Sequence, residues 1–435
     1  MLARGCLLIL IAGSAQAAET GFTPDAYIRE VIAASPESKK AHDDLRTASA
    51  RWKSEFAAAF FPALSFTGTL TPAKLARDNR FTFGAWRGAA NDIRLTPGAS
   101  WNLFNSFADS LSVRTSRLSR EVAREDLEIT RQASALEAVR AYYALLLRDK
   151  LLAVAQANRK AQSEQYELTQ DRYRHGMKSL SDLLKTETDW RSSELEVETA
   201  EAERRLALFK FNILLAQPED TPVEFDVDLT LGTTEAPRLE DGLRAAPRDR
   251  PEMRKDRLRR RHADAAFKQA VRNVLPGLAL DFDLSHPVSA DYQRTTQDFG
   301  IGTAAYGFTL KLALPSSFNF YSQVQDLAAA RAVRRATLHD SEAQRRAVRE
   351  EVYRAHVNLL RATRSYQISV RKEEISRQNY EIVAEQYSQG SADVIRLSQA
   401  LLDHVRAQRE RMLAYNDTNI SRAEYRKAIG QPIWR

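Results

Sequence analysis

Two kinds of hydrophobic pattern alternate along this chain, and they divide it into long helices and short strands. Between Phe107 and Arg174 apolar side chains recur every seven residues, at Val122, Ile129, Leu136 and Tyr143. A heptad pattern of this length, uninterrupted by proline or glycine, predicts a coiled-coil helix on the order of 100 Å long. We expect an antiparallel return helix over residues 178–217, and the same arrangement again over 319–388 and 391–429.

Four shorter segments alternate apolar and polar residues with a period of two, the pattern of a half-buried strand. They are residues 64–70, 93–103, 278–284 and 308–314. A soluble sheet packed on a core is one interpretation, and a membrane barrel with water inside is the other. Charged residues on one face, aromatic residues and prolines at the strand ends, and polar loops over 71–92 and 285–305 favour the barrel.

Four strands cannot close a barrel by themselves, because the smallest closed membrane barrels have about eight. An open sheet edge in lipid would leave backbone groups without hydrogen bonds. The strands therefore predict a barrel shared by several chains, and three chains would supply enough strands for an aqueous lumen. We expect four charged side chains to line that lumen: Arg94, Asp281, Asp283 and Lys311.

The chain also repeats itself after a shift of 214 residues. Tyr173-x-x-Gly176 recurs as Tyr387-x-x-Gly390, and LLAQP at 214–218 recurs as AIGQP at 428–432. Each copy contains a helix, a β-hairpin and a long helical hairpin. The predicted units are a first repeat over 18–217 (β-hairpin 62–104, tip near residue 176), a linker over 218–250 and a second repeat over 251–435 (β-hairpin 276–315, tip near residue 390).

A glycine separates the two long helices in each copy. Gly176 and Gly390 can take the left-handed conformation that closes a helix without a Cβ clash. Ser179 or Ser181 would then cap the returning helix in the first copy, and Ser391 would do so in the second. Both corners lie at the end of the helices that is farthest from the strands.

The N-terminus has the pattern of a secretory signal peptide. Arg4 precedes an apolar run at residues 7–12, and Ala15-Gln16-Ala17 fits the cleavage pattern. We expect residues 1–17 to be removed, although a buried N-terminal helix would give a similar pattern. The only cysteine, Cys6, lies in the removed segment, so the mature chain would contain none. No later apolar run is long enough for a transmembrane helix.

Charge and candidate chemistry argue against several functions. The net charge is +7, and much of the surplus lies in residues 244–261. No aromatic residues interleave with this basic run, so we interpret it as a solvated helix face and expect no nucleic acid partner. The seven histidines form no metal-binding spacing, and Gly300-Ile-Gly302 lacks the third glycine of a phosphate loop. We expect no enzyme activity, no metal and no cofactor.

Taken together, the duplicated plan, the two Y-x-x-G corners, the LLAQP and AIGQP ends and the proline before each first strand resemble the TolC family of outer-membrane efflux proteins. The resemblance covers nearly the whole mature chain. It implies a mostly α-helical fold with a small β part, in which a homotrimer forms a 12-stranded transmembrane β-barrel in outer-membrane lipid. Long antiparallel coiled-coil helices would form an α-barrel tunnel in the periplasm.

The resemblance also implies an entrance at the helix tips that opens by untwisting and docks a periplasmic adaptor (a membrane fusion protein) and an inner-membrane pump. Carried over to this sequence, the tip residues are Tyr173, Gly176, Lys178, Asp182, Tyr387, Gly390, Asp393 and Arg396. Family members often have an acidic residue six positions after each glycine. Asp182 matches that pattern and Arg396 does not, so we consider an Asp182–Arg396 network that holds the entrance closed.

The function implied is a passive exit duct for small molecules in a tripartite efflux system. The exit duct of a type I protein secretion system uses the same architecture and is the first alternative. A periplasmic coiled-coil structural protein without a pore is the second. The sequence does not identify the cargo.

Overall fold

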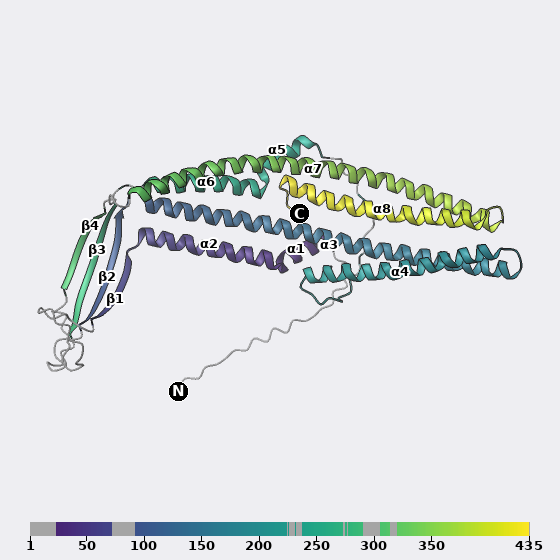
Figure 1. The fold of residues 1–435 in the computed structure, drawn as a ribbon, viewed down its shortest axis with the longest axis horizontal. Helices are drawn as coiled ribbons and strands as arrows, with labels where there is room; N and C mark the ends of the chain where they lie inside the picture. The colour runs from purple at the N-terminus through teal and green to yellow at the C-terminus, as the bar shows by residue number, and fades with distance from the viewer. Residues whose placement is uncertain are drawn as a thin grey trace, which may run out of the picture.

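The computed structural model describes residues 23–71, 92–223, 225, 231, 237–272, 275, 277–289, 305–313 and 320–434. The predicted signal peptide, most of the two predicted polar loops and part of the predicted linker lie outside these residues. The described chain is elongated, with a sheet at one end and the tips of two helical hairpins at the other (Figure 1).

The secondary structure confirms a mostly helical fold with four strands and a twofold repeat. The first repeat contains α1 (Pro24–Ala34), α2 (Pro36–Phe60), β1 (Ala63–Thr71), β2 (Asp92–Phe104), α3 (Ala108–Arg174) and α4 (Leu180–Leu214). The second contains α5 (Leu239–Asp249), which falls in the segment predicted as the linker, followed by α6 (Pro251–Arg272), β3 (Gly277–Ser289), β4 (Ala305–Ala313), α7 (Phe320–Ser388) and α8 (Val394–Ile429). The two copies therefore place the same six elements in the same order.

The four strands form one antiparallel sheet in the order β1-β2-β3-β4. Trp101 of β2 lies opposite Leu280 of β3, which lies opposite Leu310 of β4, so apolar residues share one face across the sheet. That face is uncovered within the described residues, and Phe66 and Phe308 are both more than 70% exposed. β1 and β4 form the two edges of the sheet.

The helices form a layer that continues from the sheet to the tips (Figure 1). Near the sheet α2 packs on α3, α3 on α6, and α6 on α7. Nearer the tips α4 packs on α3, α3 on α8, and α8 on α7. The layer thus has two different edges, formed by α2 followed by α4 on one side and by α7 on the other.

The largest core lies where the short helix α1 packs against α3. The rings of Tyr27 and Phe211 stack with their centroids 4.0 Å apart, and Tyr142 lies 5.9 Å from Tyr27. The Tyr27 hydroxyl donates a hydrogen bond to the carbonyl oxygen of Phe211 at 3.1 Å. Burial raises the pKa of the Tyr27 hydroxyl, consistent with a dry core. This core joins the N-terminal helix to the end of α4, 184 residues later.

Both hairpin corners close as the glycines predict. Gly176 has φ +70° and Gly390 has φ +80°. The amides of Met177 and Ser391 donate to the carbonyl oxygens of Arg172 and Gln386, the 6→1 bond of a Schellman motif. The prediction that Ser391 caps the second returning helix is therefore wrong, because this residue belongs to the closing turn of α7.

The caps of the two returning helices differ. Ser179 caps α4, as one of the two predicted serines, and exchanges hydrogen bonds with Asp182 in a capping box. α8 begins at Val394, and its cap is Asp393, whose carboxylate accepts a hydrogen bond from the amide of Arg396 at 2.7 Å.

The end of α4 offers a prediction on stability. Ala216 has φ +56°, whereas its repeat counterpart Gly430 has φ +84° in the same type of turn. A left-handed conformation costs a residue with a Cβ atom about 1–2 kcal/mol. We expect Ala216→Gly to raise the free energy of unfolding by about 0.5–1 kcal/mol in urea denaturation followed by circular dichroism. Ala207→Gly inside α4 is the control and should lower it by about 1 kcal/mol; a decrease for both variants would contradict the prediction.

Candidate functional site

The two helical hairpins meet near their tips around one tyrosine. Tyr387, in the last turn of α7, is only 3% exposed and packs in an apolar cluster with Val383, Val394 and Leu397. The guanidinium carbon of Arg172 lies 5.0 Å from the centroid of its ring, and the Lys178 Nζ atom lies 5.4 Å from it. Two cations of the first hairpin therefore contact an aromatic ring of the second, a favourable arrangement.

A polar contact between α4 and α8 joins the same two hairpins slightly farther from the tips. The Ser398 hydroxyl of α8 donates a hydrogen bond to the Asp189 carboxylate of α4 at 2.8 Å. The other oxygen of Asp189 pairs with Lys185 on the same helix. The described tips are thus held together within one chain by a cation–π cluster and a charge-assisted hydrogen bond.

The predicted tip residues have unequal environments. Tyr173, the repeat counterpart of Tyr387, is 38% exposed. The side chains of Asp182 and Asp393 cap their own helices, so both carboxylates already accept backbone hydrogen bonds. Arg396 is exposed, and within one chain the described residues include no ion pair between it and Asp182. The predicted Asp182–Arg396 network therefore has no counterpart within a single copy.

Sequence reasoning missed Arg172, Asp189 and Ser398 as contributors to the tip. Arg172 and Asp189 sit among other charged residues of amphipathic helices, where most charges are simply solvated. Only the packing of α8 against the first hairpin gives these side chains a partner. The Tyr-x-x-Gly motif alone does not show which side chains of the other hairpin lie against it.

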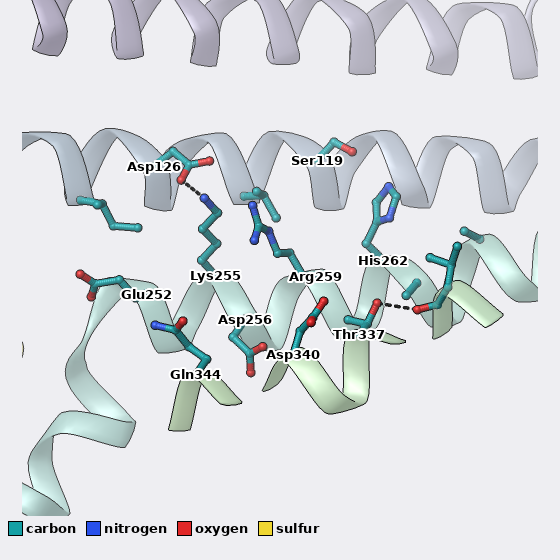
Figure 2. A pocket seen from close by; sticks show the side chains of 15 residues that line it. Ser119, Asp126, Glu252, Lys255, Asp256, Arg259, His262, Thr337, Asp340 and Gln344 are labelled. Carbon is teal, nitrogen blue, oxygen red and sulfur yellow. Dashed lines mark hydrogen bonds and ion pairs between the residues drawn. The ribbon is translucent and has the colours of Figure 1, made fainter. Parts of the chain in front are cut away.

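A groove of about 710 Å³ runs along the helix layer between α3, α6 and α7 (Figure 2). Its lining combines aliphatic residues with ionisable ones, including Asp126, Lys255, Arg259, His262 and Asp340, as Figure 2 shows. The groove residues of α3 lie at 119, 122, 126 and 129, whereas Ala135, Ala138 and Tyr142 of the same helix belong to the core that contacts α1. With 3.6 residues per turn these two sets of residues lie on opposite sides of α3.

The charges of the groove are only partly paired. Lys255 pairs with Asp126, and Figure 2 shows the two side chains meeting between α6 and α3. Arg259 and Asp340 form no ion pair among the described residues. Partial burial lowers the pKa of His262, so its neutral form is favoured. A surface of this kind is suited to contact with water rather than to binding an apolar ligand.

Three of the predicted lumen residues, Asp281, Asp283 and Lys311, lie on the sheet face opposite the apolar one. The Lys311 Nζ atom lies 2.8 Å from the Asp281 carboxylate, across neighbouring strands β4 and β3. Asp283 lies between Gly98 and Gly307 on the adjacent strands. The backbone of Arg94 lies in β2 opposite Thr69 and Pro287, and its side chain is outside the described residues. The structure therefore brings Asp281 and Lys311 into contact and places Asp283 on the same strand face as Asp281.

Two features are absent from the described residues. No group of histidine, cysteine and carboxylate side chains there is arranged to hold a metal ion. No helix in the same part of the chain combines the length and the apolar character that crossing a membrane requires.

Comparison with known proteins connects this architecture to one group. A profile of the family described as outer membrane efflux protein matches residues 27–212 and 243–431. Among curated protein sequences, none matches this chain.

Solved structures of similar fold extend over nearly the whole chain. The transmembrane channel protein CusC aligns with a TM-score of 0.79 and 14% identity, over 94% of this chain and 92% of its own. The outer membrane protein VceC of Vibrio cholerae aligns with a TM-score of 0.78 and 16% identity, over 94% and 96%. The Campylobacter jejuni CmeC outer membrane channel aligns with a TM-score of 0.77 and 15% identity, over 94% and 88%. At these identities the likeness establishes a common fold.

Proposed function

Because this chain belongs to the outer membrane efflux protein family, we propose that it is the outer-membrane exit duct of a tripartite efflux system. In this role it conducts small molecules passively from the periplasm to the outside. The assembly is a homotrimer that works with a periplasmic adaptor and an inner-membrane pump, and its helical tunnel extends into the periplasm.

The observation that carries the proposal is the pair of unlike edges on the helix layer. The α7 edge exposes aliphatic side chains at Ile368, Ile375 and Ile382, and the α4 edge exposes Leu184, Leu195 and Leu206. Helix stripes of this kind are normally covered, since a long helix gains stability mainly by burying its apolar side. Because the two edges differ, copies would join head to tail, and such contacts close into a ring when the rotation allows.

The sheet supports the same assembly. Its apolar face is exposed, its other face carries charges, and it ends in two strand edges that lipid would leave unsatisfied. Three copies would supply twelve strands, a number that encloses a water-filled lumen. In that barrel the lumen residues are Arg94, Asp281, Asp283 and Lys311.

The hairpin tips would form the entrance and the adaptor-docking surface at the opposite end. The residues involved are Tyr173, Gly176, Lys178, Asp182, Tyr387, Gly390, Asp393 and Arg396. In this proposal the contacts around Tyr387 help to hold the entrance closed. Any pairing of Asp182 with Arg396 would form between neighbouring copies, where it would add to that closure.

The test is the native mass of the purified protein in detergent, combined with its conductance in planar bilayers. One chain has a mass of 49.1 kDa before removal of the predicted signal peptide, and we expect a particle of three mature chains that forms discrete channels. A monomer without conductance would contradict the proposal and favour a coiled-coil structural protein. A deletion strain that loses an exported polypeptide but keeps its resistance to toxic compounds would assign the duct to protein secretion instead.

A further inference from the structure

We propose that Asp283 sets the charge preference of the barrel lumen, so that the duct conducts cations, and cationic cargo, more readily than anions. The inference rests on the proposed function, because it requires that the charged face of the sheet lines the lumen of a trimer. It goes further by assigning one of the lumen residues to selectivity and by naming the charge class of the cargo. In a trimer, Asp283 would form a ring of carboxylates at one height, an arrangement that favours cations.

Asp281, the nearest carboxylate on the same strand, already has a partner. It lies 2.8 Å from the Lys311 Nζ atom, and its side chain is only 16% exposed. Ser100 and Thr309 lie opposite it on the two neighbouring strands. Opposite charges this close together largely cancel for an ion that passes at a longer distance, so this pair contributes little to selectivity.

Asp283 is in a different position on the same face. The residues opposite it are both glycines, Gly98 on β2 and Gly307 on β4, so no side chain directly opposite can cover it. Asp283 is exposed and forms no ion pair with any described residue. A Cβ atom at position 98 would lie 3.4 Å from the Asp283 Oδ1 atom, whereas one at position 307 would have open space around it. This carboxylate therefore remains open to solvent and to passing ions.

The described side chains of this sheet face carry a net negative charge. They include two carboxylates, Asp281 and Asp283, and one cation, Lys311, which leaves one negative charge per copy. The Arg94 backbone lies opposite Pro287, four residues beyond Asp283 along β3, or about 13 Å away at about 3.3 Å per residue. The Debye length is about 8 Å at physiological salt, so charges separated by this distance in water are largely screened.

The helix tips offer no comparable excess of negative charge. The predicted tip residues include two carboxylates, Asp182 and Asp393, and two cations, Lys178 and Arg396. Both carboxylates accept hydrogen bonds from backbone amides at the start of their own helices. We therefore assign the charge preference to the sheet end of the chain rather than to the tips.

Ion selectivity of the reconstituted protein tests the assignment. The reversal potential of planar bilayers in a KCl gradient gives the ratio of cation to anion permeability. For the unmodified protein we expect a ratio above one at about 0.1 M salt and close to one at about 1 M, where the Debye length falls to about 3 Å. Asp283→Asn should lower the ratio several-fold at the lower salt. The matched control, Asp220→Asn, makes the same change in the exposed segment after α4 and should leave the ratio unaltered.

Two further variants change the charge of this face without altering Asp283. Gly307→Lys places a cation opposite Asp283, where the structure leaves room for a side chain, and should lower the ratio as Asp283→Asn does. Lys311→Gln removes the partner of Asp281 and should raise the ratio, because two carboxylates per copy are then unpaired. These variants test the same assignment if Asp283→Asn does not assemble.

The outcomes separate the selectivity of the lumen from its existence. A ratio that falls with Asp283→Asn or Gly307→Lys and rises with Lys311→Gln supports the inference. Channels of the unmodified protein without cation preference, or a preference that survives Asp283→Asn, would overturn the inference and leave the duct proposal standing. An unmodified protein that forms no channels would overturn the duct itself, and with it the lumen that the inference requires.

Discussion

Tyr387→Ala should open the helix tips and raise the conductance of the reconstituted protein several-fold. Replacing a buried aromatic residue with alanine typically costs about 3–5 kcal/mol, and this ring also carries the contacts of Arg172 and Lys178. The apolar neighbours of the ring, Val383, Val394 and Leu397, belong to its own hairpin, so only the contacts of the two cations distinguish the closed arrangement. A difference of about 1–2 kcal/mol for these contacts changes the ratio of closed to open channels by roughly 5–30-fold. Single-channel recording in planar bilayers measures the effect.

Two matched variants test whether loss of the Tyr387 ring itself causes the rise in conductance. Tyr173→Ala removes the repeat counterpart, which is 38% exposed, and should leave conductance unchanged. Tyr387→Phe keeps the ring and removes a buried hydroxyl that has no hydrogen-bond partner among the described residues, so we expect the conductance of the unmodified protein. Equal opening by Tyr387→Phe and Tyr387→Ala would show that the ring contacts do not hold the tips.

Arg250→Ala should lower the free energy of unfolding by about 3 kcal/mol, the lower end of the cost of breaking a buried ion pair. The Arg250 side chain is 3% exposed and donates hydrogen bonds to Glu351 at 2.6 Å and to Glu252 at 3.2 Å. Burial alone would lower the pKa of Arg250, but its bonds to the two carboxylates raise it, so the charged form is kept. We choose the lower end of the range because Glu351 is 49% exposed and stays hydrated when its partner is removed.

The measurement is urea denaturation of the detergent-solubilised protein, followed by circular dichroism. Arg244→Ala is the control on the same segment. Arg244 is 74% exposed and lies 3.5 Å from both Glu240 and Asp241, so its removal should change stability by less than about 1 kcal/mol. Similar losses for the two variants would mean that the buried pair contributes no more than a surface one.

The long elements were readable from the sequence because their patterns are local. α3 begins one residue after the predicted start and ends at the predicted Arg174, and α7 ends at the predicted residue 388. The strand ends were less readable. β3 continues to Ser289 although its alternation stops near His286 and Pro287, because its backbone keeps pairing with β2. That pairing depends on a partner strand far away in the sequence.

The two short helices were not predicted, and the reason is physical. α1 and α5 have 11 residues each, α5 contains Pro247, and each is followed within two residues by another proline that starts the next helix. Helices this short are not stable alone. α1 is held by the stacking of Tyr27 on Phe211, a contact that no local pattern reveals.

The tip residues show the same division between local and distant causes. Tyr173 and Tyr387 share one motif, and each is followed three residues later by a glycine that closes the turn. The sequence therefore located both corners. It could not show that one tyrosine is buried and the other exposed, because that depends on how the second hairpin packs on the first.

The unbroken course of α3 and α7 has a mechanical consequence. Neither helix contains a proline or glycine over its 67 or 69 residues, and sharp kinks in helices almost always need such a residue or a local defect. These rods offer no hinge, so a torque applied at one end is shared as small elastic strain over many turns. A twist applied at the hairpin tips is therefore transmitted along α3 and α7, so the tip end and the sheet end of the chain are mechanically coupled.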